Sequence, residues 1–252
     1  MNVNKIYFGD CLELMPKIAD KSIDMVLCDL PYGTTQCAWD SVINLANLWR
    51  EYARVVKPNG AVLLFAQTPF DKVLGASNLL MLKYEWIWEK TQATGHLNAK
   101  KMPMKAHENI LVFYKQLPIY NPQKTDGHIR KVSSAKNRAA CIVRRNKKED
   151  YLYNKEMAES VTGYDSTERY PRSVLKYKTD KQKLSLHPTQ KPVALCEYLI
   201  RTYTNEGETV LDNCIGSGTT AVACKQSGRN FIGIEKERKY FDIAHNRIKS
   251  MV

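Results

Sequence analysis

The sequence lacks any long apolar run. Its longest uninterrupted hydrophobic stretch is Ala61 to Ala66, far short of the roughly 18 residues that a membrane-spanning helix needs. The amino-terminal region also lacks a basic stretch followed by an apolar one, which is the pattern of a secretory signal. We therefore expect no membrane association, no export and a cytoplasmic location.

Paired cysteines are also absent. The seven cysteines are scattered along the chain, and none forms a Cys-x-x-Cys pair. This pattern argues against a disulfide framework and against a zinc site, and it fits a reducing compartment. His107 and Glu108 are adjacent, but no further metal ligand has a suitable spacing, so we predict a structural pair and no metal site.

Acidic residues are in short supply. The 252 residues include 38 Lys or Arg against 26 Asp or Glu, a net charge of +12, which indicates a polyanionic partner. The segment 121–185 has sixteen basic and eight acidic residues and so carries +8 of this charge. Because it has few aliphatic runs, it is predicted to be an inserted subdomain.

On both sides of this segment, short apolar strands alternate with helices of 3.6-residue periodicity. Strands are predicted at 6–8, 24–28, 61–65, 84–88, 110–114, 209–211 and 231–234, and helices at 43–55, from Pro192, through 221–226 and from Lys236. Alternation of this kind builds a mostly parallel sheet covered by helices. The predicted domains are an α/β domain made of residues 1–120 and 186–252 and an inserted region at 121–185.

A glycine loop follows the strand that ends at Asp212. The loop, 213–220 (NCIGSGTT), can approach a ligand closely, and the helix that it opens offers free N–H groups to a negative charge. A Walker loop is excluded because Gly218 stands where its lysine is needed. Glu235 ends the next strand and is placed to bind ribose hydroxyls, so the two features predict an adenosyl ligand. A nicotinamide dinucleotide stays open, because Ala221 completes its fingerprint spacing.

The segment Asp29-Leu30-Pro31-Tyr32 follows the strand 24–28, at the edge of a parallel sheet where ligands bind. The exocyclic amino group of a nucleobase is a poor nucleophile, because its lone pair is delocalised into the ring. Acceptors such as Asp29 and the Leu30 carbonyl can surround its N–H groups, while Tyr32 offers a stacking face for an extruded base. Taken alone, the segment suits a plain turn at the edge of the core equally well.

Together these segments resemble the S-adenosylmethionine-dependent amino-methyltransferases of DNA. The marker motifs of that family are a D/N/S-P-P-Y/F tetrad, matched by 29–32, and an F-x-G-x-G loop, matched around 216–218. The tetrad comes first, as in the circularly permuted β group, which places a target-recognition region between the two motifs. Residues 187–192 (HPTQKP) and 9–11 (GDC) resemble two further cofactor-side motifs.

The resemblance implies a Rossmann-like, circularly permuted α/β fold whose seven-stranded sheet has six parallel strands and one antiparallel strand. It implies S-adenosylmethionine as the cofactor and double-stranded DNA as the partner. The implied catalytic residues are Asp29, Leu30, Pro31 and Tyr32. The implied cofactor-binding residues are Asp10, Cys11, Asp29, Thr189, Lys191, Asp212, Asn213, Cys214, Gly216, Ser217, Gly218, Thr219, Thr220 and Glu235.

In this family picture Asp29 binds the target amino group and Tyr32 stacks on the flipped base. Glu235 holds the ribose of the cofactor, and Thr189 and Lys191 close its pocket. The sequence departs from the family pattern at two places. Leu30 replaces the first proline of the tetrad, which keeps the backbone carbonyl, and residues 213–214 (NC) stand where a Pro-Phe pair is common.

Basic side chains outside these motifs are predicted to contact DNA phosphates, which set affinity and carry no sequence information. They are Lys100, Lys101, Lys105, Arg144, Arg145, Lys147 and Lys148.

The predicted function is site-specific methylation of adenine N6 in DNA after base flipping, as in a restriction-modification system. The stretch 29–40 (DLPYGTTQCAWD) is especially similar to phage and bacterial adenine-N6 enzymes, and Asp29 favours adenine, since N4-cytosine enzymes usually carry Ser there. The alternatives are an N4-cytosine methyltransferase, a non-catalytic nucleic-acid-binding protein, a nicotinamide oxidoreductase, and methylation of RNA or glutamine. The sequence leaves open a homodimer and a cognate restriction endonuclease.

Overall fold

The computed structural model describes residues 1–33, 42–146, 161–180 and 190–251. The chain divides into two compact units. One consists of Met1–Asn121 and Arg172–Val252, and the other of Pro122–Pro171. The unit 122–171 is shorter than the predicted insertion 121–185, because residues just after it form an edge strand of the larger unit.

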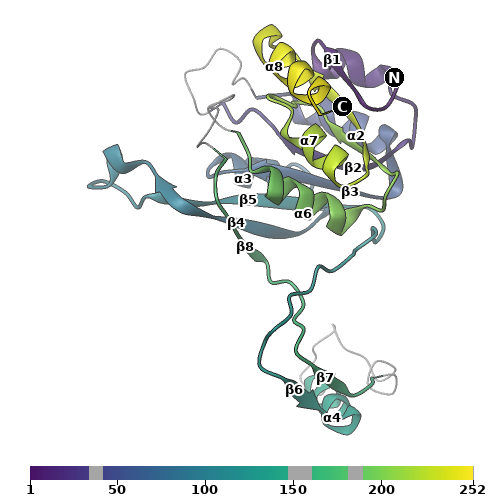
Figure 1. Ribbon diagram of the computed structural model, residues 1–252, viewed down its shortest axis with the longest axis vertical. Coiled ribbons are helices and arrows are strands. Elements are labelled where there is room, and N and C mark those ends of the chain that lie inside the picture. Colours follow the sequence, from purple (N-terminus) through teal and green to yellow (C-terminus); the bar gives the residue numbers. More distant parts are fainter. Residues whose placement is uncertain (34–41, 147–160, 181–189, 252) are drawn as a thin grey trace. The chain divides into compact units, whose positions relative to one another are not determined.

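The larger unit is built on an eight-stranded sheet in the order β1-β10-β9-β2-β3-β5-β4-β8 (Figure 1). Its strands are β1 (Lys5–Phe8), β2 (Ile23–Asp29), β3 (Val56–Ala66), β4 (Leu82–Thr94), β5 (Lys105–Phe113), β8 (Val174–Tyr177), β9 (Thr209–Asp212) and β10 (Asn230–Glu235). β5 pairs antiparallel with β3 and β4, and the other pairings of this sheet are parallel. The predicted Rossmann-like sheet is thus confirmed, and β8 extends it by one strand.

Helices cover both faces of this sheet, because side chains alternate along each strand. In β2, Val26 and Cys28 pack in one core cluster, while Met25 and Leu27 pack in the other. The first cluster lies under α1 (Cys11–Leu14), the 3-10 helix η1 (Met15–Lys17), α2 (Leu45–Val55) and α3 (Phe70–Ala76). The second lies under α6 (Val193–Tyr203) and α7 (Thr219–Gln226). α8 (Arg238–Lys249) packs beside α7 against β1 and β10.

The strand order creates a crevice between β9 and β2. β9 and β10 lie between β1 and β2 in the sheet, although they come last in the chain. From β2 the chain continues to a helix on one face, and from β9 to a helix on the other. In open α/β sheets, ligands bind where the connections diverge in this way.

β4 and β5 form a long hairpin that projects beyond its neighbours in the larger unit (Figure 1). Its tip includes the 3-10 helix η2 (His96–Asn98), which follows Gly95 in a left-handed conformation. Leu97 is 87% exposed there, and Met102 and Met104 are also exposed. The segment 91–107 contains three lysines and no acidic residue.

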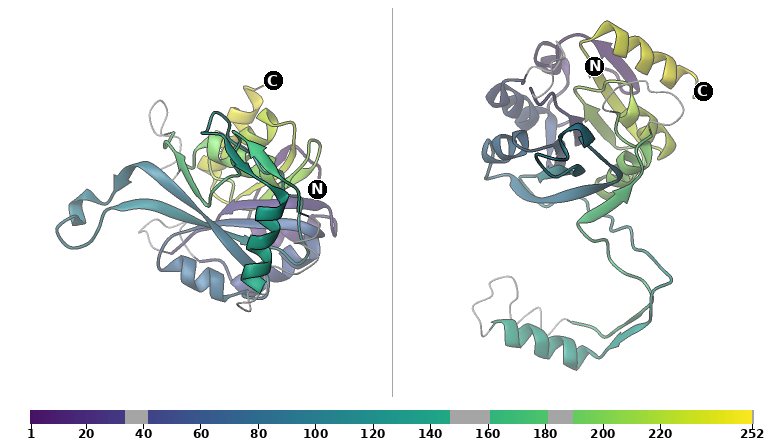
Figure 2. Two further views of the ribbon diagram at one scale, coloured as in Figure 1. Left: turned by 90° about the horizontal axis from the view of Figure 1, so that it is seen from below. Right: turned by 90° about the vertical axis from the view of Figure 1, so that its left-hand side faces the viewer.

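The smaller unit is a short hairpin with one helix. β6 (Lys131–Ser133) pairs antiparallel with β7 (Tyr164–Ser166), and α4 (Ala135–Asn146) follows β6 (Figure 2). Thr125 and Arg169 exchange two backbone hydrogen bonds, of 3.0 and 2.8 Å, so the incoming and outgoing chains are paired at that point. No helix in the described parts of either unit is long and apolar enough to span a membrane.

Candidate active site

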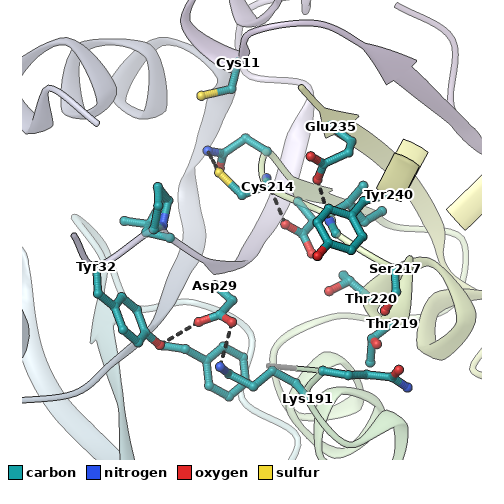
Figure 3. Close-up of a pocket in the computed structure, with 18 of the residues that line it drawn as sticks. Cys11, Asp29, Tyr32, Lys191, Cys214, Ser217, Thr219, Thr220, Glu235 and Tyr240 are labelled. Carbon is teal, nitrogen blue, oxygen red and sulfur yellow. Dashed lines mark hydrogen bonds and ion pairs between the residues drawn. The ribbon is translucent and has the colours of Figure 1, made fainter. Parts of the chain in front are cut away.

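A pocket of about 620 Å³ opens at the edge of the sheet where the parallel strands end. Its walls come from segments far apart in the sequence (Figure 3). They are Gly9 to Leu12 after β1, Asp29 to Tyr32 from the last residue of β2 onward, and Asp212 to Ser217 from the last residue of β9 onward. Because β5 runs antiparallel, its first residues reach the same edge, and Lys105 and Glu108 also line the pocket.

The predicted catalytic tetrad lies in the wall of this pocket. The Tyr32 hydroxyl donates a hydrogen bond to Oδ1 of Asp29 over 2.6 Å, and the Tyr32 ring stacks on Phe70 with the ring centroids 5.3 Å apart. Leu30 is buried in the core cluster of that face. Its apolar side chain therefore fixes the tetrad to the hydrophobic core, at the position where the family carries a proline.

The second oxygen of Asp29 faces a lysine. Lys191 Nζ donates to Asp29 Oδ2 over 2.6 Å and lies 3.1 Å from Oε2 of Glu108, whose Oε1 is 2.7 Å from Lys90 Nζ. The side chains of both lysines are 7% exposed. The resemblance assigned Lys191 to the cofactor pocket, and the structure places its ammonium on the tetrad carboxylate (Figure 3).

The charged groups of this network shift one another's pKa values. Burial raises the pKa of Asp29, with Glu108 acting in the same direction and Lys191 against it. Burial disfavours the charged form of Lys191, but Asp29 and Glu108 outweigh this effect and raise its pKa. Burial likewise acts against the charge of Glu108, but the two lysines outweigh it and lower the pKa of that carboxyl. We therefore expect Glu108 and Lys191 to be charged at neutral pH.

The glycine loop adopts the cradle that its sequence predicts. Gly216 and Gly218 have φ angles of +51° and +84°, which favour glycine because a side chain is strained there. A Cβ at Gly218 would also lie 3.1 Å from the Cβ of Ala244. Ser217, Thr219 and Thr220 are nearly buried and line the pocket at the start of α7.

Glu235 fixes the shape of this loop. It is 7% exposed, its Oε2 accepts the Gly216 N–H over 2.8 Å, and its Oε1 accepts the Glu237 N–H over the same distance. A carboxylate has about four acceptor positions, so Glu235 can also accept a hydrogen bond from a ligand hydroxyl. Asp10 is also engaged locally, since its Oδ1 accepts the Leu12 N–H over 2.8 Å and caps α1.

The residues in place of the family's Pro-Phe pair have polar partners. Asn213 Oδ1 accepts a hydrogen bond of 2.6 Å from the buried hydroxyl of Tyr52, and Asn213 Nδ2 lies 3.5 Å from Cys214 Sγ. The wall that would hold a phenylalanine is therefore built from an amide and a thiol. The pocket combines the hydroxyls of the loop, the free N–H groups at the start of α7 and the carboxylate of Glu235. This set of groups fits an adenosyl ligand that also carries a carboxylate.

The structure brings most of the predicted site residues together. The pocket is lined by Asp10, Cys11, Asp29, Leu30, Pro31, Tyr32, Lys105, Lys191, Asp212, Asn213, Cys214, Gly216, Ser217, Thr219, Thr220 and Glu235. Gly218 shapes the loop from behind that wall. Lys100 and Lys101 lie exposed between β4 and β5. Thr189, Lys147 and Lys148 lie outside the described residues, as do the side chains of Arg144 and Arg145 on α4.

The predicted pairing of His107 with Glu108 is wrong. His107 is exposed and Glu108 is buried, because neighbouring residues of a strand face opposite sides. Glu108 instead pairs with Lys90 and Lys191. Its position two residues before the apolar run 110–113 was the available signal. Among the described residues, no group of three or more His, Cys, Asp or Glu could hold a metal ion.

Comparisons with known proteins agree with this geometry. A family model described as DNA methylase matches residues 23–246. The chain is 27% identical over 257 residues to the Type II methyltransferase M1.MboII of Moraxella bovis, covering 97% of this chain and 96% of that protein. It is also 27% identical over 260 residues to M.HpaI of Haemophilus parainfluenzae, covering 98% of this chain and 74% of that protein.

Solved structures show the same likeness. The complex of M1.HpyAVI with SAM matches with a TM-score of 0.66 and 25% identity, covering 97% of this chain and 98% of that one. The cytosine-N4-specific PvuII DNA methyltransferase matches with a TM-score of 0.69, covering 100% of this chain and 92% of that one. At 14% identity, this second likeness concerns the fold alone.

Proposed function

This chain belongs to the DNA methylase family, and from that premise we propose that it methylates the N6 amino group of adenine in DNA, with S-adenosylmethionine as the methyl donor. The observation that carries the proposal is the position of Asp29. Its carboxylate lies in one pocket with an aromatic ring at position 32 and with the glycine loop 213–220.

The pocket has one side for the cofactor and one side for the target base. We assign the cofactor to the side formed by the glycine loop, Glu235 and Asp10, where hydroxyls, backbone N–H groups and carboxylates suit an amino acid and a ribose. S-adenosylmethionine, when bound, supplies a methyl group on a cationic sulfonium. We assign the target base to the side formed by Asp29, Leu30 and Tyr32.

On the base side, Asp29 is the acceptor for the target amino group. The Tyr32 hydroxyl occupies Oδ1 of Asp29 in this structure, so this oxygen becomes available when the Tyr32 ring turns to stack on the base. The amino nitrogen gains positive charge as its bond to the methyl carbon forms and the bond from that carbon to sulfur breaks. It must then lose one proton, and Asp29 is placed to receive it and release it to solvent.

Adenine is proposed over cytosine because the first tetrad residue is Asp. The N4 amino group of cytosine presents the same chemistry to Asp29, so N4-cytosine methylation is the alternative within the family. Since the solved relatives include a cytosine-N4-specific enzyme of the same fold, the base has to be identified in the product.

Basic segments on both units are proposed to hold the DNA. Lys100 and Lys101 on the β4–β5 hairpin are candidates for phosphate contacts, as are Arg144, Arg145, Lys147 and Lys148 in the segment 121–185. The unit 122–171 is proposed to select the target sequence, since it interrupts the catalytic unit between the tetrad and the cofactor loop.

The test is transfer of labelled methyl from S-adenosylmethionine to unmethylated DNA, followed by digestion to nucleosides. We expect label in N6-methyladenine and at least a roughly thousandfold loss of rate in Asp29→Ala, because the base loses its acceptor. Asp20→Ala is the matched control, since Asp20 is exposed and paired with Arg54. Label in cytosine would refute the base assignment, and unchanged transfer by Asp29→Ala would refute the role of Asp29.

A further inference from the structure

Glu108 is a buried carboxylate in the pocket wall that no motif of the sequence assigns to catalysis. It is 5% exposed and stands near the start of β5, opposite Trp88 of β4 in the sheet. It lies 2.7 Å from Lys90 and 3.1 Å from Lys191. Its Oε2 has no hydrogen bond of good geometry, so its contact with Lys191 is chiefly electrostatic.

The network around Glu108 balances its charges at the tetrad. It joins the carboxyl groups of Asp29 and Glu108 to the amino groups of Lys90 and Lys191. Without Glu108, Lys90 would lose its carboxylate partner, and Lys191 would keep Asp29 as its remaining one. Because interactions between charges are stronger in a buried site than in water, the loss of the Glu108 charge would act directly on the reacting groups.

We propose that Glu108 is a positioning residue for methyl transfer, which holds Lys191 against one oxygen of Asp29 and cancels the positive charge of Lys191 next to the target amino group. This inference rests on the proposed function. During transfer the amino nitrogen becomes cationic, and an uncompensated ammonium on Asp29 would oppose that change. It would also weaken Asp29 as the acceptor of the departing proton.

Titratable groups from several elements face Asp29 and Glu108. They are Tyr32 after β2, Cys28 on β2, Lys90 on β4, Lys191 before α6, Cys196 on α6, and Asp212 on β9. Within this set Glu108 raises the pKa of Asp29 by charge repulsion, and Lys191 acts against it. Removal of the Glu108 charge should therefore lower the pKa of Asp29.

The test compares the full-length protein with Glu108→Gln and Glu108→Asp. In Glu108→Gln we expect kcat to fall roughly tenfold or more, while the Kd for S-adenosylmethionine stays within about threefold. The acidic limb of the kcat profile should move to lower pH. Glu108→Asp keeps the charge and should restore part of kcat and the original limb. Glu89→Gln is the matched control, because Glu89 lies on β4 in a partly exposed ion pair with Lys176.

A second measurement decides the inference without activity. The carboxyl carbon of Asp29 can be followed by ¹³C NMR against pH, with Asp29→Asn used to identify its signal. We expect the Asp29 midpoint to move to lower pH in Glu108→Gln and to stay unchanged in Glu89→Gln. An Asp29 midpoint that does not move in Glu108→Gln would overturn the proposal. So would a loss of kcat that Glu108→Asp does not relieve and that leaves the pH profile unchanged. Either result would leave Glu108 with a structural role alone. Wild-type protein that fails to methylate DNA would count against the proposed function only.

Discussion

Asp212 ends β9 in the pocket wall, and its surroundings make it an unusual acid. It is 5% exposed, and burial raises its pKa from 3.8 to about 7. Hydrogen bonds from Thr220 and from the backbone N–H of Cys214 oppose this rise without cancelling it. The folded protein therefore holds a proton on Asp212 at pH values where the unfolded chain has released it.

This difference predicts a pH dependence of stability. Because the pKa of Asp212 is higher in the folded state, folding stability is greatest below about pH 4 with respect to this group and falls as the pH rises toward 7. Asp212→Asn removes this titration. Between pH 5 and pH 8, the wild type should lose roughly 2 kcal/mol more unfolding free energy than the variant.

Urea unfolding at the two pH values measures this effect, with exposed Asp20→Asn as the control. Equal losses in the wild type and Asp212→Asn would contradict the assignment. Asp29 and Glu235 also have raised pKa values, and both residues are present in both proteins.

Single residues of the site were predictable where a local pattern marks them. Asp29 and Asp212 each end an apolar run, and the glycines of the loop stand out by composition. No local sequence pattern indicates Lys90 and Glu108, because their ion pair depends on the pairing of β4 with β5. Only the sheet register, Trp88 opposite Glu108, shows that a lysine of one strand reaches a carboxylate of the next.

We predict that the β4–β5 hairpin contacts DNA phosphates. Lys100 and Lys101 are exposed near its tip, and each lysine that neutralises a phosphate contributes close to one unit to the slope of log K against log salt. Replacement of both by Ala should reduce the magnitude of that slope by about 2, with no change in the Kd for S-adenosylmethionine.

Fluorescence anisotropy of labelled duplex DNA across salt concentrations provides the slope. Lys5→Ala with Lys83→Ala is the matched control, because both lysines stand at the amino ends of strands, at the edge of the sheet opposite the pocket. A slope that falls equally in the control would show that only net charge matters and that the hairpin makes no specific contact.

At the scale of elements, buried strands were easier to predict than exposed ones. β2 contains the uninterrupted apolar run 25–28, and both central residues of β9 are fully buried and apolar. β8 (VLKY) is partly exposed, lies within a basic segment and was assigned to the insertion. α3 follows the sequence Gln67-Thr68-Pro69 and is too short for a helical period to be visible. The lengths of β4 and β5 depend on their pairing with each other, which composition does not encode.

The division of the molecule into two units predicts that catalysis and target selection can be separated. Thr125 and Arg169 are already paired through their backbones, so a two-residue glycine turn can replace 126–168. The shortened protein should bind S-adenosylmethionine with a Kd within about threefold of wild type, because every described residue of the pocket lies in the larger unit. It should lose at least roughly a hundredfold in site-specific methylation, since phosphate contacts without base contacts do not specify a sequence.

Calorimetric titration of the cofactor and sequencing of methylated DNA measure the two properties. A matched replacement of 126–168 by an unrelated small hairpin domain controls for the loss of mass. Retention of the wild-type methylation pattern by either variant would place target selection in the larger unit.

The position of β9 and β10 between β1 and β2 also sets an order of events during synthesis. Asp29 leaves the ribosome long before Lys191 and the loop that follows β9. Until β10 has been synthesised, β1 has no strand to pair with, because β10 is its neighbour in the sheet. The sheet cannot be completed, and Asp29 cannot pair with Lys191, before the last quarter of the chain has emerged. A chain that terminates early therefore carries the tetrad without its pocket, so incomplete products of translation are unable to modify DNA.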